Sequence, residues 1–317
     1  MINVVQELRK VIDEDVDKKY YLYNGKDVLN LPLHVPVEIP ILQFMKDFYE
    51  KYISLIGDSN KILKECGVKD IDEIIDKVKI FCKAYIQMHE TILSGNAASA
   101  YQEMENILSD DYFIKAELKK QDPPLLLYRA RTGINWTQKE DFYHIPFNKT
   151  YLCDSYRFSI AGYPSLYLGF SKEVCKKELR EEKCSCIELE LKKDVYVIDL
   201  TWDKDYVKSN SASTFLLAYP VIAACYVVPF YCKNMKRECP DIKQKFKEQY
   251  LFPQFVTMFV KKNPIVEGIM YFTTRDENLN PLINEDKNLA LFPKYTNNAF
   301  YDEELIGKFD WTDISIL

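Results

Sequence analysis

The chain has 317 residues, of which 47% are hydrophobic and 28% charged, which is typical of a globular protein with a sizeable buried core. Its net charge of -6 argues against broad binding to nucleic acid, because phosphate backbones are bound by an excess of Lys and Arg. The nine cysteines form neither a disulfide framework nor C-x-x-C pairs with matching histidines, and no signal-peptide pattern opens the sequence. We therefore expect a cytoplasmic protein with reduced thiols and no bound metal.

Residues 1–120 predict an all-α bundle. One apolar stripe runs at helical spacing from Ile41 to Leu55, and a second runs from Ile71 to Tyr85. The polar run at 119–122 is followed by Pro123 and Pro124, which stop a helix and favour extended chain. We expect a domain boundary there, with residues 1–120 serving regulation or assembly and residues 121–317 forming a second domain.

Residues 121–317 predict a mixed α+β domain. Short β-prone runs occupy 125–131, 165–170, 186–191, 195–201 and 268–274, and helical patterns occupy 172–181, 212–226 and 242–261. The apolar run at 215–230 contains Pro220 and is shorter than the roughly 20 residues that span a bilayer. It predicts a buried core helix, so we expect no membrane contact.

Two arginines lie two residues apart in the first of these strands. Arg129 and Arg131 should therefore project from the same face. Guanidinium groups in such a pair can bind a pyrophosphate through charge-assisted hydrogen bonds. The alternative is that both are ordinary surface arginines.

Glu178 falls on the apolar stripe of the helical pattern at 172–181, together with Val174 and Cys175. A carboxylate on such a stripe is costly to bury unless it is paired or functional. It is either part of a reactive site or a buried partner of Arg157. Ser171 is placed to cap this helix.

Tyr271 and Thr273 share one face of the strand at 268–274. The functional interpretation is that a hydroxyl at the strand end faces the same pocket as the arginine and the glutamate. The alternative is β-propensity alone, because Thr is common in strands whatever their role.

Several of these segments, taken in order, resemble the RES family, which is named for an Arg, a Glu and a Ser, in its longer form with an N-terminal helical region. The resemblance covers about residues 123–295. It rests on LYRAR at 127–131, FYHIPF at 142–147, RFSIAGYPSLYLG at 157–169 with Glu178, YLFPQF at 250–255 and GIMYFTT at 268–274. It implies an ADP-ribosyltransferase-like fold with a mixed β-sheet core.

The resemblance also implies cleavage of the nicotinamide–ribose glycosidic bond of NAD, by hydrolysis or by phosphorolysis with inorganic phosphate as co-substrate. Such a protein would be a toxin or an anti-phage defence effector with an antitoxin or regulatory partner. The alternatives are a protein ADP-ribosyltransferase and a catalytically weakened NAD-binding interaction protein. The oligomeric state stays open, with a homo-oligomer as one option.

The family's residues carry over as Arg129, Glu178 and Thr273, where Thr273 stands in place of the serine. The resemblance then implies that Glu178 binds the ribose hydroxyls and stabilises the developing positive charge, while Arg129 holds phosphate. The expected remaining contacts to NAD are Arg131, Tyr143, His144, Arg157, Tyr167 and Tyr271. Tyr143 and His144 would lie on the nicotinamide side. Thr keeps the hydroxyl but adds a methyl and stiffens χ1, which alters the room around the nicotinamide.

Overall fold

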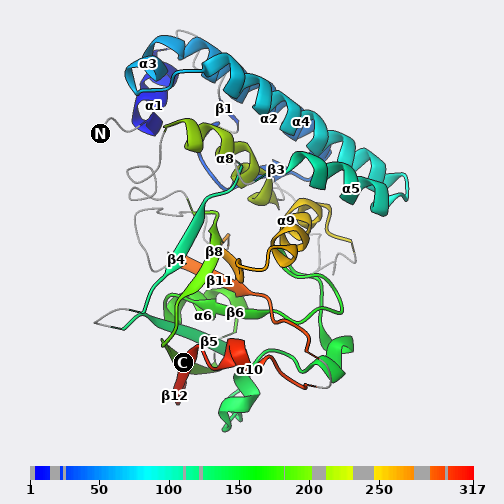
Figure 1. Cartoon of the computed structure of the whole chain (residues 1–317), viewed down its shortest axis with the longest axis vertical. Coiled ribbons are helices and arrows are strands. Elements are labelled where there is room, and N and C mark those ends of the chain that lie inside the picture. The colour runs from blue at the N-terminus through cyan, green and yellow to red at the C-terminus, as the bar shows by residue number, and fades with distance from the viewer. Residues whose placement is uncertain are drawn as a thin grey trace. The chain divides into compact units, whose positions relative to one another are not determined.

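The computed structural model describes residues 4–14, 22–23, 26–109, 112–120, 124–181, 183–201, 212–230, 246–274, 286–296 and 299–317. These residues form a mixed α+β protein, as predicted (Figure 1). The chain divides into two compact units. The first comprises Met1–Ile114 and Trp202–Phe255, and the second comprises Lys115–Thr201 and Val256–Leu317.

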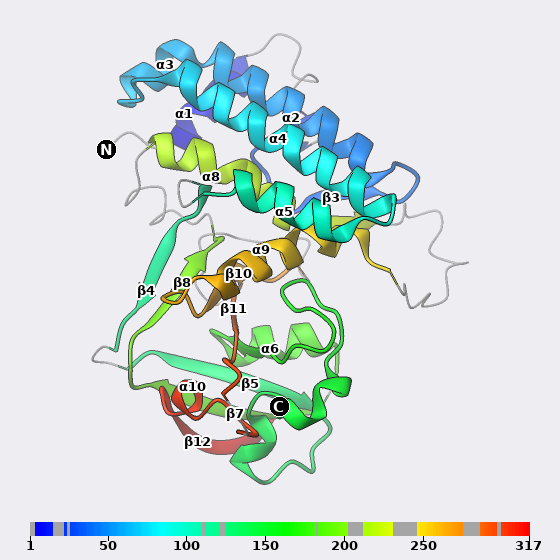
Figure 2. The same cartoon turned by 45° about the vertical axis from the view of Figure 1, so that its right-hand side comes forward.

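The first unit is mainly helical. Its described helices are α1 (Val4–Glu14), α2 (Ile41–Asp58), α3 (Asn60–Glu65), α4 (Ile71–Leu93), α5 (Ala97–Ile107) and α8 (Ala212–Cys225), with the short 3-10 helix η5 (Glu248–Tyr250). The two predicted apolar stripes lie on α2 and α4, which pack side by side (Figures 1 and 2). Two small sheets complete the unit: β1 (Leu22–Tyr23) pairs with β2 (Lys26–Asp27), and β3 (Leu33–Pro36) lies parallel to β9 (Val227–Phe230).

Helix α8 belongs to the first unit, whereas the sequence analysis assigned its residues to the second domain. It is buried on all sides from Phe215 to Cys225 and packs against α4. The Tyr219 hydroxyl donates a hydrogen bond to the Val28 carbonyl at 2.8 Å, and the Tyr52 hydroxyl donates to the Leu216 carbonyl at 3.0 Å. An all-apolar helix needs partners around its whole circumference, and the N-terminal helices supply them.

The helical pattern predicted over 212–226 is confirmed by α8, but the apolar run at 215–230, which was assigned to a buried core helix, is not helical to its end. The helix ends at Cys225, and Val227–Phe230 form strand β9. Two adjacent β-branched residues, Val227 and Val228, suit a strand better than a helix, and β3 gives that strand a partner.

The second unit is built on an eight-stranded sheet with the order β12-β7-β5-β6-β11-β10-β8-β4. Of these strands, β5 (Leu126–Thr132), β6 (Leu166–Gly169), β7 (Cys184–Leu191), β8 (Val195–Asp199) and β10 (Gly268–Phe272) were predicted. The others are β4 (Lys115–Leu118), β11 (Lys287–Leu291) and β12 (Phe309–Ile316). Since β4 pairs with β8, the second unit starts at Lys115, a few residues before the boundary expected at 120/121.

Different elements pack on the two faces of this sheet. On the core face, Leu127, Leu168 and Ile187 pack in one apolar cluster with Phe142 of the 3-10 helix η2 (Lys139–Phe142) and Leu305 of α10 (Glu303–Ile306). This cluster positions the strands.

The opposite face, called here the helix face, carries α6 (Lys172–Leu179). A Cβ on Gly169 would lie 2.8 Å from Cys175 Sγ, so the absence of a side chain lets α6 approach β6 closely. The Cys175 thiol also donates to the Tyr128 carbonyl on β5. The remaining described elements are η3 (Phe147–Leu152) and α9 (Leu251–Lys262), which runs across the division between the units.

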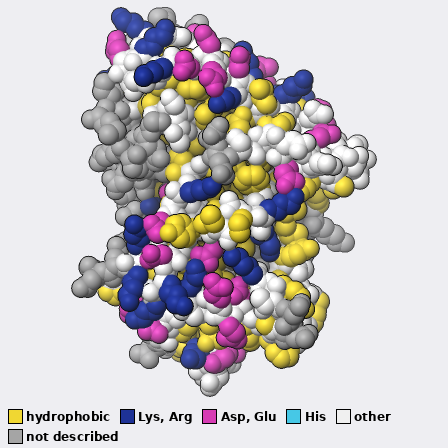
Figure 3. Space-filling model, viewed as in Figure 1, with side chains coloured by type: hydrophobic (Ala, Val, Ile, Leu, Met, Phe, Trp, Pro, Cys, Tyr) yellow, Lys and Arg dark blue, Asp and Glu magenta, His cyan; other side chains and the backbone are white. Residues whose placement is uncertain are grey.

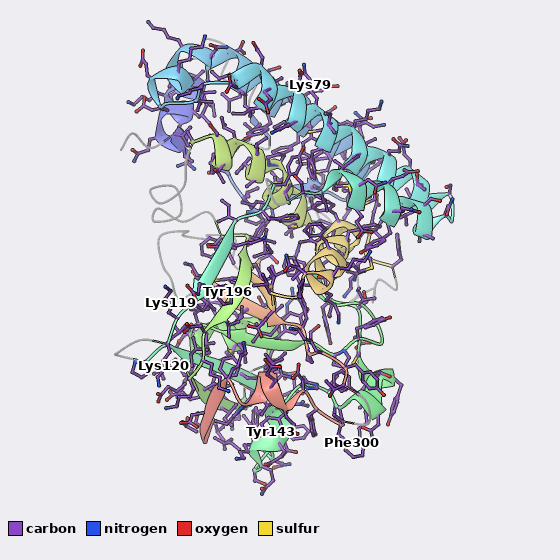
Figure 4. The ribbon with its side chains drawn as sticks, viewed as in Figure 1. Lys79, Lys119, Lys120, Tyr143, Tyr196 and Phe300 are labelled. Atoms are coloured by element: carbon purple, nitrogen blue, oxygen red, sulfur yellow. The ribbon has the colours of Figure 1, made fainter. Side chains whose placement is uncertain are left out.

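Charged side chains of both signs lie intermixed on the face of the molecule shown in Figure 3. One such group lies at the sheet edge, where the Tyr196 hydroxyl on β8 donates to Glu117 on β4, and Glu117 also pairs with Lys119 (Figure 4). No helix among the described residues combines the length and the apolar character that a bilayer span requires.

Candidate functional site

Glu178 lies in the last turn of α6. The helix begins at the Ser171 cap, whose hydroxyl accepts a hydrogen bond from the Val174 backbone N–H at 3.2 Å, and it ends at Arg180 in a left-handed conformation with φ of 57°. Val174 and Cys175 are buried against the sheet, while Glu178 is half-buried. The predicted apolar stripe is therefore present, and the carboxylate lies at its end.

Two buried donors hold the Glu178 carboxylate. Thr273 Oγ1 donates to Glu178 Oε1 at 2.6 Å, and Asn288 Nδ2 donates to the same oxygen at 2.9 Å. The Thr273 side chain is fully buried and that of Asn288 is 4% exposed. Donors without access to water bind an ionised group more strongly than exposed ones do, so this geometry orients the carboxylate firmly.

These donors come from neighbouring strands. Thr273 directly follows β10, and its backbone N–H donates to the Asp286 carbonyl at 2.9 Å. Asn288 on β11 lies between Tyr271 on β10 and Gly169 on β6 in the register. The site is therefore assembled where β10 ends and β11 begins, on the helix face.

Two cationic side chains contact residues close in sequence to those that hold this carboxylate. Arg157 Nη2 donates to Thr274 Oγ1 at 3.5 Å, which places the guanidinium next to the residue that follows Thr273. Lys177, which precedes Glu178 on α6, pairs with Asp286 at 3.3 Å. The structure thus brings Thr273 to Glu178, and it brings Arg157 to the residue that follows Thr273.

The predicted tyrosines Tyr167 and Tyr271 lie on the same face. Tyr167 is the register partner of Ala290 and Tyr271 that of Asn288, so alternation directs both side chains to the helix face. The Tyr271 ring packs at 4.7 Å from that of Phe158 and is nearly buried. The Tyr167 ring is half-buried, and its centroid lies 6.2 Å from that of the exposed Tyr156.

Arg129 is not brought to Glu178. It is the register partner of Ile187 and therefore points to the core face, through the sheet from the carboxylate. Its Nη1 donates to the Tyr167 carbonyl at 3.0 Å, and burial, with a smaller effect of Arg131, lowers the pKa of Arg129 to about 9. The expectation that this guanidinium meets Glu178 is corrected, because sequence alternation fixed which residues share a face but not which face that is.

Arg131 and Tyr143 form a separate group. Arg131 Nη2 donates to the Tyr143 carbonyl at 3.4 Å, and the guanidinium carbon lies 5.2 Å from the centroid of the Trp136 ring. The Tyr143 ring, whose position is labelled in Figure 4, packs with its centroid 4.7 Å from that of Trp311. Like Arg129, Arg131 lies on the core face of β5.

His144 is engaged by backbone on both sides of its ring. Nε2 accepts the Asp302 backbone N–H at 2.9 Å, so the proton resides on Nδ1, which donates to the Ile145 carbonyl at 2.8 Å. The side chain is 1% exposed, and burial lowers its pKa, which favours the neutral ring. The backbone contacts give His144 a structural role, and its expected contact with nicotinamide stays a prediction.

Asn288 was missed by the sequence analysis. It is the polar residue directly before the apolar run at 289–292, in a strand that is buried throughout. A buried side-chain amide needs a hydrogen-bond partner. That requirement could have identified Asn288 as a candidate site residue from the sequence. Within the described ranges, no three His, Cys, Asp or Glu side chains gather as metal ligands.

The chain is similar to a protein of Bacillus subtilis (strain 168) that carries the name "Putative toxin YopC". The two are 26% identical over 298 residues, which covers 80% of this chain and 65% of that protein. The chain thus spans just under two thirds of this relative's length. No known protein-family profile matches the chain, and no solved structure matches it either.

Proposed function

We propose that the second unit is an enzyme that cleaves the nicotinamide–ribose bond of NAD, with Glu178 as its central catalytic residue and Thr273 and Asn288 as the positioning residues that hold it. The observation that carries this proposal is a half-buried carboxylate fixed by two buried donors at the ends of adjacent strands. The order of the RES-like segments in the sequence supports the same assignment.

The chemistry suits a fixed carboxylate. The bond between ribose C1′ and nicotinamide N1 breaks, and both electrons go to the ring nitrogen, which neutralises the cationic nicotinamide. The ribose is left oxocarbenium-like, and a carboxylate beside it stabilises the positive charge and accepts hydrogen bonds from the ribose hydroxyls. An oxygen of water or of inorganic phosphate then forms the new bond to C1′, and water loses a proton in doing so.

Arg157 is the group in this arrangement best suited to the pyrophosphate of NAD, because a guanidinium binds phosphate oxygens through paired hydrogen bonds. Arg157 contacts Thr274, which is the next residue in the chain after Thr273. In this proposal it takes the phosphate-binding role that the sequence analysis gave to Arg129. Tyr167, which is half-buried on the same face, is the aromatic side chain available to a nucleoside portion, whereas Tyr271 is nearly buried beneath that face.

We further propose that this activity makes the protein a toxin, with an antitoxin or regulatory protein as its partner. The support is the name of the Bacillus subtilis relative together with the consequence of NAD loss for a cell. Depletion of a central cofactor needs no further target to stop growth.

The test is to incubate the purified chain with NAD and to measure nicotinamide release with and without inorganic phosphate. Wild type should release nicotinamide, and Glu178→Gln should lower the rate by at least roughly 100-fold, the scale expected for a preorganised charge-stabilising group. The matched control is Glu173→Gln, an exposed glutamate in the first turn of the same helix, which should keep the wild-type rate.

The products distinguish the forms of the reaction. ADP-ribose indicates hydrolysis, a phosphorylated ADP-ribose indicates phosphorolysis, and labelled protein after incubation with tagged NAD indicates transfer. Equal rates for wild type and folded Glu178→Gln would refute the catalytic assignment. An absence of release from wild type in all conditions would favour the noncatalytic interaction protein.

A further inference from the structure

The second unit contains a cavity of about 630 Å³ that is separate from the Glu178 centre. Rings of Phe147, Tyr163, Phe292 and Tyr295 line it, together with the side chains of Lys261 and Lys294. The volume lies within the range of about 300 to 1,000 Å³ that small-molecule sites occupy.

The strands themselves separate the cavity from the Glu178 centre. Val266 precedes β10 and Phe292 follows β11, and both line the cavity. Thr273 and Asn288 lie at the opposite ends of the same two strands. Asn288 and Phe292 are four residues apart and Val266 and Thr273 are seven residues apart, which in extended chain corresponds to roughly 13 to 23 Å, so the two sites are distinct.

Lys261 gives the cavity a positive charge. Its Nζ lies 5.0 Å from the centroid of the Tyr163 ring and 5.9 Å from that of Phe292. Partial desolvation of the ammonium beside these rings lowers the pKa of Lys261, although the residue as a whole is exposed. Lys294, at the rim, donates through Nζ to the Pro264 carbonyl at 3.2 Å. Among the described lining residues there is no Asp or Glu, so the ligand must supply the negative charge.

Two of the aromatic rings are open to a ligand. Tyr163 is 56% exposed and Tyr295 is 67% exposed, and they reach the cavity from segments far apart in the sequence. The Tyr295 ring stands edge-on to that of Phe147, with centroids 5.2 Å apart. Exposed rings beside a cation are a suitable surface for a flat aromatic group. Every nucleobase has a π-face that can stack on an aromatic side chain.

We propose that this cavity is a second ligand site that binds a free mononucleotide, with the base stacked on Tyr163 or Tyr295 and the phosphates held by Lys261 and Lys294. A phosphate alone would leave the aromatic walls without contact, and an apolar molecule would leave Lys261 without an anion. A nucleotide satisfies both, since lysine binds phosphate as a point charge.

The test is isothermal titration calorimetry on the full chain with ADP, AMP, adenosine and inorganic pyrophosphate as probes. ADP should bind more tightly than either adenosine or pyrophosphate, because each of those lacks one half of the recognised ligand. Lys261→Gln should weaken ADP binding by at least about tenfold. The matched control is Lys172→Gln, since Lys172 also lies over a tyrosine ring, that of Tyr128, but outside the cavity, and it should bind ADP like wild type.

Glu178→Gln separates this inference from the proposed function, because it should lose nicotinamide release and keep ADP binding. Loss of ADP binding in Glu178→Gln but not in Lys261→Gln would overturn the inference, and so would no ADP binding by wild type. If Lys261→Gln does not fold, as judged by its thermal unfolding, Tyr163→Leu replaces it, since that ring is more than half exposed. Wild-type ADP affinity in folded Tyr163→Leu would count equally against the site.

Discussion

Glu178 illustrates what a sequence tells about a single residue. Its position on the stripe with Val174 and Cys175 predicted a carboxylate turned toward apolar surroundings, and the structure places it half-buried at the end of that stripe, against two polar donors. Its partners lie 95 and 110 residues further along the chain. Spacing within a helix cannot reveal such partners, because they depend on which strands become neighbours.

Thr273 offers a prediction at the same scale. Thr273→Ser keeps the hydroxyl that donates to Glu178, so its rate of nicotinamide release should stay within roughly threefold of wild type. Thr273→Val keeps the shape and removes the donor, and the rate should fall about 10- to 100-fold, the scale of a lost hydrogen bond to a charged group. Single-turnover assays with saturating NAD check this, and equal rates for the Val and Ser variants would contradict it.

His144 predicts a dependence of stability on pH. Because burial lowers its pKa in the folded state, the folded protein favours the neutral ring. This contribution to stability is complete above the unfolded pKa of about 6.5 and is lost as the pH falls toward the lower folded value. Protonation would also place a hydrogen on Nε2, which accepts the Asp302 N–H.

The measurement is the melting temperature of wild type and His144→Gln between pH 7.5 and 5.5. The melting temperature of wild type should fall further on acidification than that of His144→Gln, because glutamine cannot be protonated in this pH range. At pH 7.5 the variant should be the less stable protein, by roughly 1 to 3 kcal/mol, if the Asp302 N–H stays unsatisfied. Parallel pH profiles of the two proteins would remove His144 as the titrating group.

Individual secondary-structure elements were predicted where the pattern is local. The stripes of α2 and α4, the short helix α6 and five strands of the large sheet follow from periodicity and β-propensity. Strands β4, β11 and β12 were missed. The run KAEL in β4 carries two charged residues and has neither an apolar run nor an enrichment in β-branched residues, and only its pairing with β8 makes it a strand.

Gly169 couples β6 to α6, and it gives a prediction at the scale of elements. In Gly169→Ala the new methyl would meet Cys175 Sγ at 2.8 Å, so α6 must shift, at a cost of roughly 1 to 3 kcal/mol in unfolding free energy. Nicotinamide release should fall as well, because α6 carries Glu178. Chemical denaturation and the release assay measure the two effects.

The matched glycine is Gly57 on α2, where an added Cβ meets nothing within 4 Å. Gly57→Ala should raise the unfolding free energy by roughly 0.5 to 1 kcal/mol, because alanine favours the helix, and should leave nicotinamide release unchanged. Equal unfolding free energies of Gly169→Ala and Gly57→Ala would show that α6 does not pack closely against β6.

At the scale of the whole molecule, the division of the chain was the least predictable feature. The sequence predicts one boundary near residue 120, whereas the first unit also contains Trp202–Phe255. Composition marks the paired prolines at 123 and 124 but cannot show that α8 returns to pack on α4. The fully apolar surface of α8 indicated that it is buried, without indicating in which unit.

This arrangement predicts that residues 1–120 alone do not form a stable domain. Such a fragment lacks α8, which accepts the hydrogen bond from the buried Tyr52, and lacks β9, which pairs with β3. It should unfold without a sharp thermal transition in far-UV circular dichroism and should aggregate on gel filtration. A monomeric fragment with a cooperative transition would contradict the division described above.

The long separation between Glu178 and its two donors also has a consequence for a newly made chain. During synthesis the carboxylate leaves the ribosome first, and Asn288 follows 110 residues later, a delay of roughly 5 to 20 seconds at ordinary elongation rates. Until then the glutamate lacks its two donors, so under the proposed function nascent protein should not yet consume NAD. The delay would leave an interval in which the proposed antitoxin can bind before the proposed activity begins.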